Sequence, residues 1–395
     1  MHDTAKTMSF LSDIAVSRRQ IAAFMVVGMG WGSFAGLVPP VKAQIGASDA
    51  LYGALMLIAS FGALGSMWLA PLAFRLAGRW AVIVGCLMIG VGFASAGHSI
   101  GPLTFVAALL LATIGSGVAD VLANSEVAEN EAKTGRALMN LNHGMYSFAF
   151  AGGAVMSGVL REAHWNPAQA LSLLSAVILV FCLLMRSPRA ITPPAEDDTV
   201  DAGRLPNLLV LVGGCVVLAA FLAEAATEGW SALHLERTLG GEPGHGALGP
   251  ALFGLTMGIG RMFGHVLASR FSDIWLMSMA CLMAAIGLGV AGAAPTITVA
   301  YAGFACAGLG ISVVVPLAFA LIGRSVPEEF RLAAIARSSA LGYAAFFLGP
   351  PAMGAVSQVF GLRVSFGLVA ALLVCVSAFL IPALARQVAQ AAGPK

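Results

Sequence analysis

The feature that most constrains this chain is a series of apolar runs, each about 20 residues long, that recurs from residue 20 to residue 385. A helix of about 20 apolar residues crosses the roughly 30 Å hydrocarbon core of a bilayer. Only 10% of the 395 residues are charged, against about 25% in an average soluble domain. The sequence therefore predicts an all-α membrane protein.

We predict twelve transmembrane helices, arranged as six plus six around one long polar, proline-rich linker. The predicted spans are 20–41, 50–70, 80–98, 103–125, 137–160, 167–185, 207–227, 248–269, 274–293, 296–322, 334–359 and 363–385. The predicted domains are a cytoplasmic N-terminal segment (1–19), an N-terminal six-helix bundle (20–185), a cytoplasmic linker (186–206), a C-terminal six-helix bundle (207–385) and a cytoplasmic tail (386–395).

The two halves repeat a pattern of small residues. The matched pairs are Gly115 with Gly308 and Gly117 with Gly310, at an offset of 193 residues, and Gly152 with Gly349 and Met156 with Met353, at an offset of 197. Two parallel six-helix repeats are the plan of one large class of secondary transporters.

Lysine and arginine are distributed unequally between the two sides of the predicted membrane. With the N-terminus inside, the inside segments hold 16 of the 21 basic residues, the outside segments hold 4, and Arg261 lies within a span. Cytoplasmic segments carry such an excess. We therefore expect a multi-pass protein of a plasma membrane of bacterial type, the inner membrane, with both termini cytoplasmic.

Several classes of function are disfavoured. A net charge of +2 and the lack of a basic stripe argue against a nucleic-acid partner. The six cysteines lie in apolar runs without metal-ligand spacing, and no catalytic constellation or phosphate-binding loop is present. We expect no enzymatic activity, no catalytic residues, no metal and no cofactor. The expected partners are a small-molecule solute, protons and the lipid bilayer.

Ionisable residues inside a span are costly and point to function. Gly117, Asp120 and Asn124 share one face of the fourth predicted span. Desolvation favours the neutral form of a carboxyl group, so Asp120 is a candidate for proton coupling. The alternative is a structural ion pair with an arginine near the cytoplasmic end.

The seventh span ends with two acids that share a face, Glu224 and Glu228. Glu224 lies within the apolar run and is a candidate for both proton coupling and substrate binding. Glu228 lies near the outer boundary, where an interfacial role is the alternative. Trp230 is either a stacking ring for a ligand or an anchor in the aromatic belt.

Polar and aromatic side chains form stripes on three other spans. The fifth span has the stripe Met139, Asn142, His143, Tyr146 and Phe150. From it we select Asn142, His143 and Tyr146 as candidates for substrate binding, with His143 also a candidate for proton coupling. Hydrogen bonding between helices is the alternative. Tyr343 and Phe346 in span 11 and Trp31 in span 1 are further binding candidates, with core packing as the alternative.

Three motifs resemble those of the major facilitator superfamily. GIGRMFGHVLASRFSD, residues 258–273, resembles the superfamily's G-R-x-x-G-D-x-L-x-D-R-x-G, and the loop around Gly78 and Arg79 resembles its counterpart in the first half. GYAAFFLGPPAMG, residues 342–354, is also common in bacterial members. The resemblance implies a transporter, by default monomeric, with Arg79, Arg261 and Arg270 as candidates for a cytoplasmic gate.

The third motif is GSGVADVLAN, residues 115–124, which resembles the G-x-G-x-x-E-x-x-x-N of the fucose–proton symporter branch. The resemblance implies that Asp120 couples protons and that Asn124 helps to hold a sugar.

The function predicted from these features is proton-coupled symport of a small polar organic solute, such as a sugar, by alternating access. The first alternative is an efflux transporter, a proton antiporter for drugs or metabolites, although the Gly-Pro motif typical of span 5 in such exporters is found in span 11 here. The second is a receptor or enzyme within the membrane. Substrate identity, direction of transport, proton or sodium coupling, and oligomeric state are not readable from the sequence.

Overall fold

The computed structural model describes residues 2–185 and 207–391, and these residues form helices joined by short turns, with no strand among them. The chain divides into two compact units. Unit 1 consists of Met1–Ala47 and Ile58–Ala195, and unit 2 consists of Ser48–Leu57 and Glu196–Lys395. The predicted linker, 186–206, lies outside the described residues.

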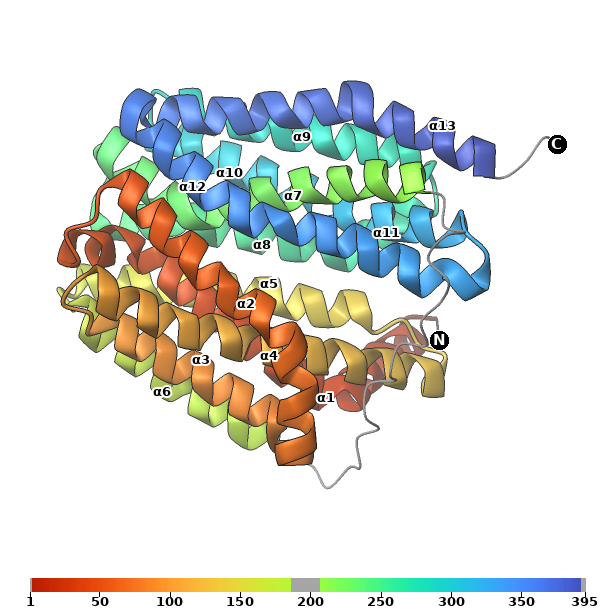
Figure 1. Cartoon of the computed structure of the whole chain (residues 1–395), viewed down its shortest axis with the longest axis horizontal. Helices are drawn as coiled ribbons and strands as arrows, with labels where there is room; N and C mark the ends of the chain where they lie inside the picture. Colours follow the sequence, from red (N-terminus) through yellow and green to blue (C-terminus); the bar gives the residue numbers. More distant parts are fainter. Residues whose placement is uncertain (1, 186–206, 392–395) are drawn as a thin grey trace. The chain divides into compact units, whose positions relative to one another are not determined.

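Unit 1 is built from long helices that pack side by side (Figure 1). Its helices are α1 (His2–Gln44), α2 (Asp49–Ala77, of which the residues from 58 onward belong to this unit), the 3₁₀ turn η1 (Gly78–Trp80), α3 (Ala81–Gly97), α4 (Pro102–Thr134), α5 (Met139–Glu162) and α6 (Pro167–Leu184). The most extensive pairings are α1 with α5 and α3 with α4.

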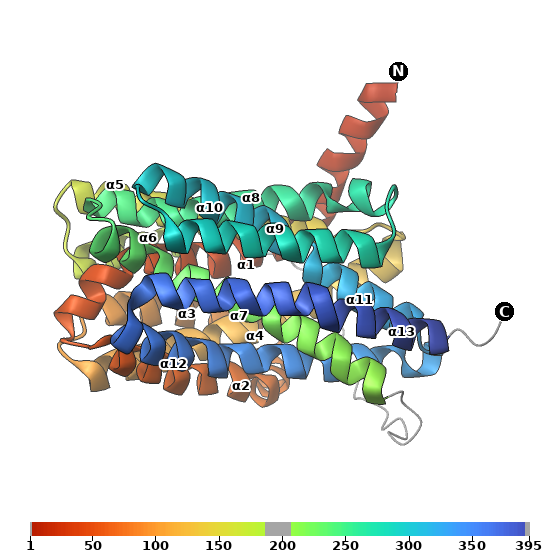
Figure 2. The same cartoon turned by 90° about the horizontal axis from the view of Figure 1, so that it is seen from above.

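Unit 2 repeats these pairings, with α7 against α12 and α9 against α10 (Figure 2). Its helices are α7 (Asn207–Leu233), the π-helical turn η3 (His234–Thr238), α8 (Pro243–Ala268), α9 (Asp273–Ala293), α10 (Ile297–Ile311), α11 (Val314–Arg324), α12 (Glu328–Cys375), the π-helical turn η4 (Val376–Leu380) and α13 (Ile381–Ala391).

Some helix boundaries differ from the predicted spans, whereas the turn between the last two predicted spans is where it was expected. Helix α1 begins at His2, well before residue 20. The predicted span 296–322 is divided between α10 and α11 because Pro316 lacks an N–H and its ring clashes with the carbonyl four residues earlier. The backbone turns sharply within α12 at Gly361 (φ 81°, ψ 167°), between the predicted spans 334–359 and 363–385. Glycine adopts this left-handed region at little cost.

The internal repeat is in register at an offset of 195 residues. A Cβ atom added to Gly92 would lie 2.5 Å from the backbone nitrogen of Ala112, and one added to Gly287 would lie 2.5 Å from that of Ala307. Likewise, Gly115 closely approaches the carbonyl of Gly85, and Gly310 closely approaches that of Ala280. In these four pairs the residue of the first half lies 195 positions before its counterpart. The offset of 193 that matched Gly115 with Gly308 was therefore wrong by two residues, because adjacent small residues align equally well in sequence.

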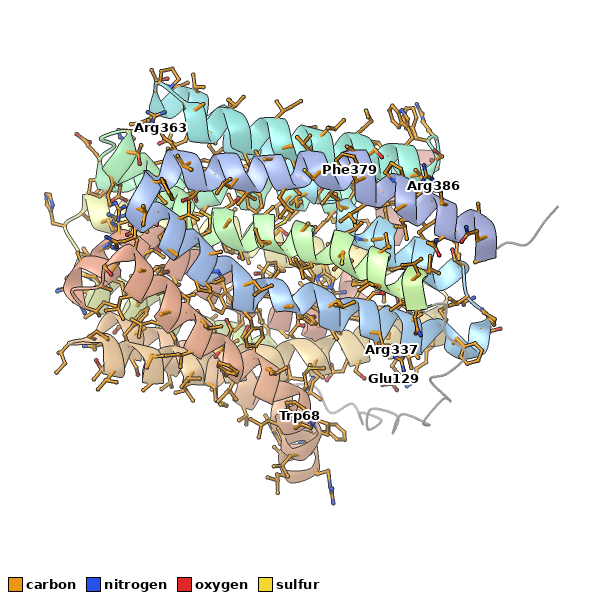
Figure 3. All side chains as sticks on the ribbon, turned by 45° about the horizontal axis from the view of Figure 1, so that its top comes forward. Trp68, Glu129, Arg337, Arg363, Phe379 and Arg386 are labelled. Carbon is orange, nitrogen blue, oxygen red and sulfur yellow. The ribbon has the colours of Figure 1, made fainter. Side chains whose placement is uncertain are left out.

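The outer surfaces carry large apolar side chains, as lipid contact requires. Trp68 in unit 1 is 71% exposed and Phe379 in unit 2 is 69% exposed (Figure 3). Eight stretches of the described residues are long and apolar enough to cross a membrane. Two of them, Asp49–Gly97 and Phe330–Ala391, are 49 and 62 residues long, which exceeds the length of one crossing.

Candidate functional site

A buried ion pair joins α7 to α8 in unit 2. The guanidinium of Arg261 (Nη2) lies 3.4 Å from Oε1 of Glu224, and the two side chains are 14% and 11% exposed. The motif resemblance had suggested Arg261 as a residue of a cytoplasmic gate. The structure places it within α8, about two helical turns before the end of that helix, where its partner is an intramembrane acid. Its role in a gate stays a prediction.

A second carboxylate lies next to this pair. Glu228 is one turn further along α7 and interacts electrostatically with both Glu224 and Arg261. Its Oε1 atom is buried and has no hydrogen-bond partner among the described residues. Two carboxylates thus lie near one guanidinium, which leaves an excess of negative charge in the cluster. An uncompensated buried charge is costly.

Trp230, two residues beyond Glu228, is buried in unit 2. Trp230 is only 1% exposed and packs edge-on against Tyr52, with 5.4 Å between ring centroids. The alternative that Trp230 is an anchor in the aromatic belt is therefore wrong, because the ring does not reach lipid. The distance of Glu228 from the end of the apolar run does not reveal that its Oε1 atom is buried.

In unit 1, Asn124 connects α4 to α5. Its Nδ2 donates to the backbone carbonyl of Asp120 at 2.9 Å, and its Oδ1 lies 3.2 Å from Nε2 of His143. The His143 ring in turn packs against Phe24 of α1, with 4.8 Å between ring centroids. Asp120 is half-buried and forms no ion pair with any described residue. The structure thus brings together an unpaired carboxylate, an amide and an imidazole.

The structural ion pair of unit 1 involves a different acid, Glu126. Arg19 Nε lies 3.1 Å from Oε2 of Glu126, and Gln20 Nε2 donates to the same oxygen at 2.7 Å. Arg19 also donates to the carbonyl of Met185 at 3.1 Å, so this network links α1, α4 and the end of α6. Sequence analysis missed Glu126 because the predicted span ended at residue 125, whereas α4 continues to Thr134.

The remaining candidates of unit 1 have mixed surroundings. The indole of Trp31 donates to Oγ of Ser116 at 3.0 Å, and Tyr146 is half-buried on α5. Asn142, in contrast, is completely buried and donates to Oγ of Ser17 at 2.7 Å. A side chain fixed in this way connects α1 to α5, which favours the packing alternative for Asn142.

In unit 2, Tyr343 and Phe346 of α12 form an aromatic cluster with Phe221 of α7. Their ring centroids lie 5.7 Å and 5.6 Å from that of Phe221. Phe221 is one turn from Glu224, so the aromatic cluster and the acidic cluster share a stretch of α7.

The two other gate candidates lie outside these clusters. The guanidinium of Arg79 sits 5.1 Å from the centre of the Trp80 ring, and Arg270 is exposed in the turn after α8. Neither has an ion-pair partner in the described part of the chain.

Comparison with known proteins identifies the family. Residues 213–394 match the sequence profile of the Major Facilitator Superfamily. The chain is 31% identical over 363 residues to an uncharacterised MFS-type transporter of Yersinia pestis, covering 90% of this chain and 92% of the relative. The chain belongs to the Major Facilitator Superfamily.

Solved structures of other transporters share the fold. A bacterial homologue of the human lysosomal transporter Spinster, in an inward-facing and occupied conformation, has a TM-score of 0.73 at 17% identity and covers 95% of this chain and 97% of its own. A D-xylose–proton symporter has a TM-score of 0.72 at 15% identity, with coverages of 93% and 97%. The protein is thus a multi-pass, all-helical MFS transporter of a small molecule and, as predicted, not an enzyme.

Proposed function

We propose that this MFS transporter is a proton-coupled symporter of a small polar organic solute such as a sugar. The observation that carries the proposal is the buried cluster of Glu224, Glu228 and Arg261. The cluster holds one carboxylate more than its guanidinium balances, and a proton supplies the missing positive charge without adding volume. Alternate exposure of such a site to the two sides of a membrane would couple transport to a proton gradient.

The proposed solute site in unit 1 consists of Asp120, Asn124, His143, Tyr146 and Trp31. Amide and imidazole groups both donate and accept hydrogen bonds, as the hydroxyl groups of a sugar require. The resemblance of residues 115–124 to the fucose–proton symporter branch supports this assignment, with Asp120 as a second candidate for proton coupling.

In unit 2 we propose Tyr343 and Phe346 as further candidates for substrate binding. Aromatic rings with a few convergent polar groups are typical of small-molecule sites, and Glu224 supplies such a group here. The fold is shared with a D-xylose–proton symporter, which is compatible with a sugar as solute.

We further propose that the chain crosses the membrane twelve times, as two six-helix repeats, and works by alternating access. Both termini are cytoplasmic and the membrane is a bacterial inner membrane. The close helix contacts that recur at an offset of 195 residues support two repeats of six helices. Figure 3 supports the orientation, since Arg363, predicted to be outside, lies at the opposite end of unit 2 from Arg337 and Arg386. Arg79, Arg261 and Arg270 remain the candidates for the cytoplasmic gate.

The test is uptake into proteoliposomes of a panel of sugars, nucleosides and small organic acids, with and without an inward proton gradient. Wild type is compared with Glu228→Gln, Asp120→Asn and the control Glu242→Gln, which removes an exposed carboxylate from the same unit. We expect gradient-driven accumulation of one solute class in wild type and in the control. Glu228→Gln should lower gradient-driven accumulation of the solute by about tenfold or more, which is equivalent to about 1.4 kcal/mol of lost coupling.

Exchange of labelled for unlabelled solute serves as the companion measurement. Exchange needs no net proton movement, so Glu228→Gln should retain it if the residue acts only in coupling. The proposal would be contradicted if wild type accumulated the solute equally with and without the proton gradient. Raised resistance to lipophilic drugs on overexpression, without uptake of any panel member, would instead support an efflux transporter.

A further inference from the structure

A groove of about 570 Å³ lies between the first turns of α7 and residues 337–344 of α12 in unit 2. Its walls are almost entirely apolar, with Val210 and Leu211 on α7 and Leu341 and Ala344 on α12. A groove of this size is within the range of sites for small organic ligands, about 300–1,000 Å³.

Contacts between the two helices lie beside the groove. Ser338 donates from its hydroxyl to the carbonyl of Val210 at 3.3 Å. One turn further along α7, a Cβ atom added to Gly214 would lie 2.7 Å from Cδ1 of Leu341, so the helices are in close contact there. Ala340 and Ala344 present only methyl groups to the groove.

The polar groups of the groove are gathered at one end. Asn207 is the first residue of α7, and Arg337 precedes the apolar residues of α12. Arg337 is exposed and forms no hydrogen bond or ion pair with any residue in 2–185 or 207–391. From Arg337 to Ala344 the open groove follows α12 for about 10 Å, from a cationic end to an apolar stretch.

We propose that this groove binds an anionic glycerophospholipid, with its phosphate at Arg337 and an acyl chain along Val210, Leu211 and Leu341. The charge and the polarity gradient of the groove both match such an amphiphile. A transported polar solute would find few hydrogen-bonding groups along these walls. Basic pockets between transmembrane helices at the cytoplasmic side bind anionic headgroups, and a lysine or arginine near the membrane surface contributes about 1 kcal/mol to this attraction.

The chain provides a matched control. Arg386 on α13 lies at the same end of unit 2 as Arg337 (Figure 3) and also has no partner within the described residues. It is not part of the groove. Arg337→Gln and Arg386→Gln therefore remove the same charge from the same end of the unit, inside and outside the proposed site.

The experiment is native mass spectrometry of the full-length protein in detergent, after addition of equal amounts of phosphatidylglycerol and phosphatidylcholine. We expect wild type and Arg386→Gln to retain phosphatidylglycerol in preference. Arg337→Gln should lower its retention about fivefold, the equivalent of about 1 kcal/mol, and Arg337→Lys should restore most of it. Ala344→Phe, which fills the groove, should lower retention of both lipids.

Thermal unfolding of each variant establishes that it is folded before lipid binding is compared. Equal retention of phosphatidylglycerol by wild type and Arg337→Gln would overturn the proposal. An equal loss in Arg386→Gln would also overturn it, because the effect would then be one of general surface charge. Equal retention of the two lipids by wild type would show that the groove does not select an anionic headgroup.

Discussion

Glu224 and Glu228 lie on one face of α7, and both interact with Arg261. Either acid can compensate the guanidinium when the other is neutralised. We therefore expect Glu224→Gln and Glu228→Gln each to cost only about 1–2 kcal/mol of stability, whereas the double variant removes both α7 carboxylates from Arg261 and costs about 3–5 kcal/mol. A double-mutant cycle measured by thermal unfolding tests this, and strictly additive losses would argue against a shared cluster.

Breaking the ion pair of Arg19 and Glu126 should lower the stability of the fold. Their ion pair is buried, with side chains 10% and 6% exposed, so Arg19→Gln should leave Glu126 poorly compensated and cost about 3–5 kcal/mol. The exposed pair of Lys133 and Glu129 is the control, and Lys133→Gln should cost at most about 0.5 kcal/mol. Thermal unfolding of the two variants compares their losses of stability, and similar melting temperatures would contradict the prediction.

At the scale of elements, two adjacent glycines of α5 differ sharply in their surroundings. A Cβ atom added to Gly153 would lie 2.6 Å from the carbonyl oxygen of Met29 on α1, whereas one added to Gly152 would meet nothing within 4 Å. Gly153→Ala should force α1 and α5 apart and cost about 1–3 kcal/mol. Gly152→Ala should be neutral or slightly stabilising, since alanine favours a helix. Unfolding midpoints that shift equally would show that α1–α5 packing does not depend on Gly153.

Helix boundaries show where local sequence decides an element and where it does not. Pro316 divides α10 from α11 and Gly361 turns the chain within α12, and both effects follow from the chemistry of a single residue. The continuation of α1 back to His2 and of α4 to Thr134 does not follow from hydropathy, because those turns are polar. Packing and ion pairs such as Arg19 with Glu126 stabilise helix beyond the apolar run.

At the scale of the whole molecule, the proposed orientation predicts where fused reporters are active. Alkaline phosphatase folds only outside the cytoplasm, so a fusion after Lys395 should be inactive. A fusion after Gly361, beside the basic residue Arg363 that we place outside, should be active. Enzyme activity in intact cells is the measurement, and the reverse pattern would invert the topology.

The class of this protein could be predicted from its sequence alone. Long apolar runs, the scarcity of charge and the superfamily motifs are properties of neighbouring residues, and they predicted an all-helical MFS transporter that the comparisons confirm. The sequence also singled out Asp120, Asn124, His143 and Glu224, although their functional roles stay predictions.

Which of these residues contact one another could be seen only in the folded structure. Glu224 and Arg261 are 37 residues apart, and Arg19 and Glu126 are 107 apart. Apolar periodicity indicates which face of a helix is buried. It does not indicate which neighbouring helix covers that face, or how the two helices are aligned along their axes. Pairing across helices depends on helix packing, which is set by close approaches such as that of Gly153 to Met29. For that reason the structure, and not the sequence, assigned the structural ion pair to Glu126 and left Asp120 without one among the described residues.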